Sequence, residues 1–116
     1  PRVFLVAATF KYLQSRNIVS QIENFELKNL SIDVSGKQAG ILLRDNSIDQ
    51  LNLTGSDTAV SQINQSNQVD TALFDIYLNS KLTLEMALID SLNINYDSTS
   101  VLSMPGVLLK RLNLYP

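Results

Sequence analysis

The chain has 116 residues, of which 45% are hydrophobic and 17% are charged, so it is long enough for one domain with a core and too short for two. Its nine Lys and Arg residues against eleven Asp and Glu residues give a formal charge of -2. A weak negative charge excludes binding to nucleic acid or to an anionic membrane by electrostatic attraction alone. The absence of Cys and His excludes disulfides, Cys/His zinc sites and Ser-His-Asp triads.

The N-terminal segment, residues 3–13, is almost wholly apolar. Helical spacing places Val6, Phe10 and Leu13 on one face at i, i+4 and i+7, which predicts a short amphipathic helix within residues 1–20 that packs on the rest of the domain. A buried strand, or the end of a truncated membrane anchor or signal sequence, is the alternative. Because the chain starts at Pro1 without a Met, we expect a fragment of a longer protein. The compartment stays open.

After residue 20 the apolar residues alternate with polar ones instead of recurring at helical spacing. The clearest case runs through Leu82, Leu84, Met86 and Leu88 and continues after residue 91 with the same parity. A period of two is typical of a strand with one buried face. Residues 21–116 are therefore predicted to be mainly β.

A six-residue pattern, apolar-x-x-apolar-x-apolar, recurs five times in this region. The copies are LKNLSI, IDQLNL, VDTALF, IDSLNI and LKRLNL, which start at residues 27, 48, 69, 89 and 109. A repeat of about twenty residues cannot bury its apolar side alone, so the copies must stack. The predicted fold is a set of stacked strand repeats, either solenoid-like or an amphipathic β-sheet.

The repeated pattern resembles the strand segment of leucine-rich repeats and covers about residues 27 to 114. The resemblance implies parallel strands and protein binding through their outward face. Where that family carries an Asn or Cys after the strand, this chain has Ser35, Ser56, Tyr77 and Asp97. No Asn ladder is therefore expected.

A second resemblance is to the β-sheet grooves of AsmA-type proteins, which also combine an apolar N-terminal segment with long alternating strands such as residues 25–32. It implies a membrane-anchored periplasmic groove for lipid transfer, so lipid is the alternative partner. A lipid carrier must leave a continuous apolar trough open, whereas a binding scaffold keeps its apolar strand face packed. A plain antiparallel sheet of long strands is the structural alternative to a parallel stack.

In a stack, the aligned copies place one polar column on the outward strand face. The column contains Ser31, Asn52, Leu73, Asn93 and Asn113, and Gln50, Thr54, Asn95 and Tyr115 lie on the same face. We expect a flat, weakly charged surface that binds a protein partner through Asn52, Asn93, Asn113, Gln50 and Tyr115. An ordinary solvated sheet face is the alternative. Open sheet edges at Leu27 and Leu114 predict self-association.

Ionisable side chains offer little chemistry. Lys28, Asp49, Asp70, Asp90 and Lys110 form one column, where solvent or a bound Ca²⁺ would offset repulsion between the carboxylates. Strict alternation would point Asp90 inward, but a bend that turns Ile89 inward is the simpler arrangement. The sequence has no Gly-rich phosphate loop and no G-x-S-x-G motif. We therefore predict a non-enzymatic interaction scaffold without a cofactor or metal.

Overall fold

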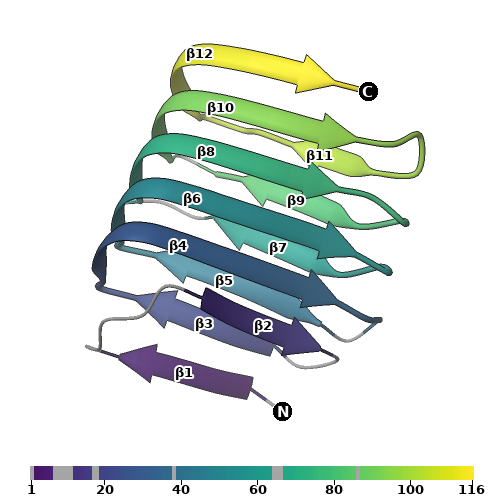
Figure 1. The fold of residues 1–116 in the computed structure, drawn as a ribbon, viewed down its shortest axis with the longest axis horizontal. Coiled ribbons are helices and arrows are strands. Elements are labelled where there is room, and N and C mark those ends of the chain that lie inside the picture. The colour runs from purple at the N-terminus through teal and green to yellow at the C-terminus, as the bar shows by residue number, and fades with distance from the viewer. Residues whose placement is uncertain (1, 7–11, 17–18, 38, 64–66, 86) are drawn as a thin grey trace.

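Twelve strands form two sheets in the computed structural model, which describes residues 2–6, 12–16, 19–37, 39–63, 67–85 and 87–116 (Figure 1). The odd-strand sheet contains β1 (Arg2–Val6), β3 (Val19–Glu23), β5 (Gly40–Arg44), β7 (Val60–Ile63), β9 (Lys81–Leu84) and β11 (Val101–Ser103). The even-strand sheet contains β2 (Tyr12–Arg16), β4 (Glu26–Ser35), β6 (Ser47–Ser56), β8 (Gln68–Ile76), β10 (Leu88–Tyr96) and β12 (Leu108–Tyr115). No described residue belongs to a helix long and apolar enough to cross a membrane.

Every strand pair in both sheets is parallel, so the chain winds as a β-solenoid in which each coil adds one strand to each sheet (Figure 1). The antiparallel alternative is therefore wrong. The register confirms the repeat: Leu27 pairs with Ile48, Ile48 with Val69, Val69 with Ile89 and Ile89 with Leu109. The five aligned copies are equivalent rungs of one stack.

The expected N-terminal helix is wrong for the residues that the structure describes. Residues 2–6 form β1, which pairs with β3, and residues 12–16 form β2, which pairs with β4. Residues 7–11, which the expected helix includes, lie outside the described residues. The strand alternative gives the correct element type. As strands, residues 2–6 and 12–16 pair with backbone groups of β3 and β4 that would lack these partners if the segment were a helix.

The core lies between the two sheets and is built by the alternating apolar residues. In the even-strand sheet, Leu30, Leu51, Ala72 and Leu92 occupy one inward column, and all four are 0% exposed. Ala72 is small, and the large Phe74 follows it at the next inward position of the same strand. In this coil, the small side chain in one column is therefore compensated by a large side chain in the next column, and the interior stays filled.

The long even strands from β4 to β10 bend near their second and third residues, where the alternation of inward and outward positions is interrupted. In β10, Ile89 is buried, whereas Asp90 and Ser91 both lie outside the core. The pairing of β10 with β12 continues from Ile89 to Ser91 and leaves out Asp90. The predicted bend that turns Ile89 inward and Asp90 outward is confirmed. Leu27, which we expected at an open edge, faces the core and is buried, and its strand β4 pairs with β6 on one side and, at residues 31–35, with β2 on the other.

Tight turns join β6 to β7 and β8 to β9, as at the right of Figure 1. In the turn after β8, the Ser80 amide donates to the Tyr77 carbonyl at 3.3 Å, and both central residues, Leu78 and Asn79, have positive φ. Asp57 and Thr58 repeat this geometry one coil earlier. Two successive positive φ angles define a type I′ turn. These two turns thus adopt the geometry without a glycine at either central position.

Two buried asparagines, Asn46 and Asn67, stack at the opposite corner and correct the expectation that no Asn ladder exists. The Asn46 side chain accepts from the Phe25 amide at 3.0 Å and donates to the Ile22 carbonyl at 3.0 Å. Asn67 accepts from the Asn46 amide at 3.2 Å and donates to the Leu43 carbonyl at 2.7 Å. The two side chains therefore link successive coils, because each bonds to backbone groups of the coil before it.

Candidate interaction surface

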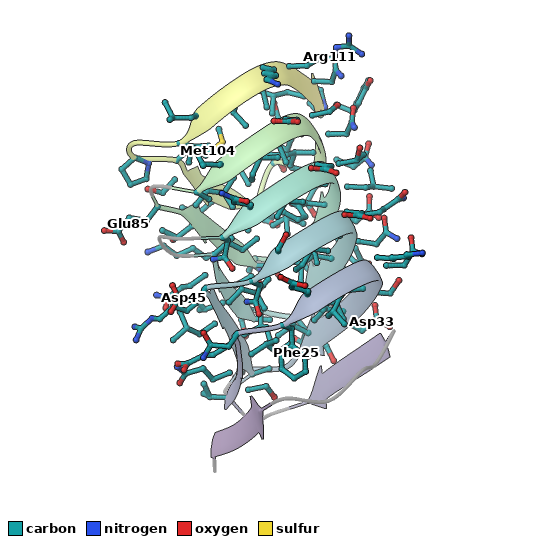
Figure 2. All side chains as sticks on the ribbon, turned by 90° about the vertical axis from the view of Figure 1, so that its left-hand side faces the viewer. Phe25, Asp33, Asp45, Glu85, Met104 and Arg111 are labelled. Atoms are coloured by element: carbon teal, nitrogen blue, oxygen red, sulfur yellow. The ribbon has the colours of Figure 1, made fainter. Side chains whose placement is uncertain are left out.

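The outward side of the even-strand sheet, which we call the outer face, carries three rows of side chains that run across the strands. Figure 2 shows side chains inside the coils, such as Phe25, and others that point away from them, such as Asp33. The rows are Asn29, Gln50, Thr71, Ser91, Arg111; Ser31, Asn52, Leu73, Asn93, Asn113; and Asp33, Thr54, Asp75, Asn95, Tyr115. Neighbours within a row are separated by about 4.8 Å, the spacing of paired strands.

The structure places all five predicted binding residues on the outer face, but not in one cluster. Asn52, Asn93 and Asn113 share the central row, whereas Gln50 and Tyr115 lie in the rows on either side. Asn113 Nδ2 donates to Asn93 Oδ1 at 2.9 Å, and both residues are half-buried. Asn93 and Asn113 therefore orient each other, and the amides of the central row present both donors and acceptors.

The outer face is only weakly charged away from its margins. Its central row has no ionisable residue, and Leu73 in the middle of that row is 37% exposed. Along the bend, Lys110 Nζ lies 3.8 Å from Asp90 Oδ2, with both side chains largely exposed. An exposed pair of this kind contributes little to stability. The described residues contain no group of three or more His, Cys, Asp or Glu side chains that could hold a metal ion.

A groove that the sequence analysis missed lies where the outer face meets the turns. It has a volume of about 360 Å³, which is within the range of roughly 300–1,000 Å³ typical of small-ligand sites. We call it the turn-edge groove. It is lined by Thr54, Asp75, Ile76, Tyr77, Asn95, Tyr96 and Asp97.

Asp97, which lines this groove, bonds to two successive turns. Its Oδ1 accepts from the Thr99 amide at 2.9 Å and the Thr99 hydroxyl at 2.6 Å, and its Oδ2 accepts from the Leu78 amide at 3.0 Å. The Thr99 hydroxyl, followed by the Leu78 amide, lowers the pKa of Asp97 to about 2. The run Asp97-Ser98-Thr99-Ser100 is a recognisable Asx-turn sequence, and it is the signal that could have indicated this feature.

Comparisons of the chain with protein-family models, with curated proteins and with solved structures find no match. The functional argument therefore depends on the surface itself.

Proposed function

We propose that this chain is a non-enzymatic interaction scaffold that binds a protein partner through the outer face, as a leucine-rich repeat uses its strand face. The observation that carries the proposal is the central row: Asn93 and Asn113 present hydrogen-bonded amides on neighbouring strands, and Asn52 presents a third amide two strands from Asn93 on the same parallel sheet. Side chains that are already ordered lose less entropy when a partner binds. A sheet surface that combines three amides with one exposed leucine suits hydrogen bonding and apolar contact with another folded protein.

The test combines a variant with a positional cross-linker. Asn52→Glu together with Asn93→Glu adds two charges on β6 and β10, which are separated by β8, so the new carboxylates do not face each other directly. We expect the circular dichroism spectrum and the thermal midpoint to stay close to those of the parent chain. Adding Asn113→Glu would place like charges on neighbouring strands, at a cost of about 0.2–1 kcal/mol.

A photoreactive amino acid placed at Asn93 should form a specific adduct in a lysate of the source cells, and excess parent chain should suppress that adduct while the double variant should not. The control carries the same group at Gln62, which is exposed on the odd-strand sheet. Equal adducts from both positions, or suppression by the double variant, would contradict the proposal. Acyl chains found by mass spectrometry of the purified protein would support the lipid-transfer alternative instead.

A further inference from the structure

The turn-edge groove differs from the rest of the outer face because carboxylates and aromatic rings lie next to each other there. Asp75 lies on β8 and Tyr77 directly follows that strand, and one coil later Asn95, which pairs with Asp75, lies on β10 and Asp97 directly follows it. Strand geometry separates the corners of this four-residue frame by about 4.8 Å across the strands and about 7 Å along them. These dimensions match one planar polar group rather than an extended chain.

The frame carries negative charge without an internal cation. No Lys or Arg lines the groove, and no ion pair joins Asp75 or Asp97 to another residue in the described part of the chain. Asp75 Oδ1 accepts from Asn95 Nδ2 at 2.7 Å, which orients the carboxylate and leaves Oδ2 without a partner among the described residues. The Asp97 carboxylate is already occupied by the turns, so its role is to supply charge.

The ring of Tyr77, which is 38% exposed, forms part of the wall beside these carboxylates. An aromatic face next to an ionised carboxylate favours an organic cation, because the cation gains both a charge-assisted hydrogen bond and a cation–π contact. Among biological cations, the guanidinium group combines a planar shape, donors in a fixed fork and weak hydration. Two carboxylates, one of them already occupied, offer too few oxygen ligands for Ca²⁺, which takes six to eight.

We propose that the turn-edge groove binds an arginine side chain of the partner protein, with the guanidinium group between Asp75 and the Tyr77 ring. This inference rests on the proposed scaffold function and names the chemistry of one contact on the same face. The arginine donates to Asp75 Oδ2, and its charge is further attracted by Asp97. Binding therefore weakens as salt concentration rises, since the groove is open to solvent.

The test uses the 116-residue chain and three capped tripeptides, Gly-Arg-Gly, Gly-citrulline-Gly and Gly-Lys-Gly, in an NMR titration of backbone amides. Citrulline has nearly the shape of arginine but no charge. We expect Gly-Arg-Gly to shift the amides of residues 75–79 and 95–99 with millimolar affinity, Gly-Lys-Gly to bind more weakly and Gly-citrulline-Gly to produce no shift. Equal shifts from the arginine and citrulline peptides would overturn the proposal.

Matched variants locate the contact. Asp75→Asn should weaken Gly-Arg-Gly binding about fivefold, whereas Asp70→Asn, which removes an exposed carboxylate from the same strand, should leave it unchanged. Tyr77→Leu should weaken binding about threefold, and Tyr77→Phe should retain it because the ring remains. Equal losses from the two Asp variants would show a non-specific charge effect and refute the site.

Failure of this inference is distinguishable from failure of the proposed function. If the groove ignores all three peptides while the Asn93 cross-link remains specific, the outer face binds a partner without this arginine contact. A titration with xylotetraose tests the competing ligand class. Shifts of the same amides by the sugar but not by Gly-Arg-Gly would assign the groove to carbohydrate and overturn the proposal.

Discussion

The stacked amides of Asn46 and Asn67 are the feature whose removal should destabilise the fold most clearly. Asn46 is 2% exposed, and its side chain serves the Phe25 amide and the Ile22 carbonyl at 3.0 Å each and Asn67 Oδ1 at 3.1 Å. In Asn46→Ala both backbone groups lose this partner. A buried polar group that loses its partner costs about 1–3 kcal/mol, so the two together predict a loss of about 2–6 kcal/mol.

This loss is large against the roughly 5–15 kcal/mol that stabilises a typical domain. Urea unfolding followed by circular dichroism should therefore show a midpoint that is lower by about 2 M, given a slope of about 1–3 kcal/mol per molar. The control is Asn29→Ala, which makes the same change at an exposed position of β4 and should alter the free energy of unfolding by less than about 0.5 kcal/mol. If the two variants unfold at the same urea concentration, the ladder does not stabilise the corner as described.

Three further predictions concern other parts of the solenoid. Ser80→Ala should stabilise the chain by about 1 kcal/mol, measured by urea unfolding. The reason is that the Ser80 hydroxyl is buried without a hydrogen-bond partner in the described structure, and an unsatisfied buried polar group is costly. A lower stability of the variant would show that the hydroxyl is bonded. Asp97 has a pKa of about 2 instead of 3.8, so its stabilising effect is complete above pH 3.8 and is lost as the pH falls through about 2. The thermal midpoint of Asp97→Asn should consequently be lower than that of the parent at neutral pH, with the difference shrinking towards pH 2, and a constant difference would contradict the assignment. Strand β12 pairs only with β10 among the described strands, and its Leu112 and Leu114 are 41% and 44% exposed. Light scattering should therefore detect self-association of the parent chain, and the double variant Leu112→Lys with Leu114→Lys should abolish it. A parent chain that stays monomeric at high concentration would refute this prediction.

The rungs were predictable because both of their determinants are local. Alternation with period two marks a strand with one buried face, and a shift of 20 or 21 residues aligns Ile48, Val69 and Ile89 without reference to any other segment. Once the copies are stacked, the outward position of Asn52 and Asn93 follows from parity alone. The bend at Asp90 was also predictable, since two consecutive polar residues between apolar ones cannot both face the core.

The strands of the N-terminal segment and the asparagine ladder were not predicted from the sequence. The apolar run 3–13 satisfies helical and strand spacing at once, and only the pairing of β1 with β3 selects the strand. Asn46 and Asn67 are separated by 21 residues, which equals the coil length at that point, and this spacing was the available signal. The resemblance to leucine-rich repeats instead places a ladder directly after the long strands, at Ser35, Ser56, Tyr77 and Asp97, which lie at the opposite corner of the coil.

The sequence by itself determined the repeat length, the inward and outward residues of the long strands and the absence of Cys/His chemistry, because these depend on order and composition along the chain. Only the tertiary structure decided that the strands run parallel, that a second sheet closes each coil, and that Asp75, Tyr77 and Asp97 frame one groove. The physical reason is that strand direction and contacts between coils depend on backbone hydrogen bonds between residues about twenty positions apart. Backbone groups are the same in nearly every residue, so the amino-acid sequence does not specify which of them pair.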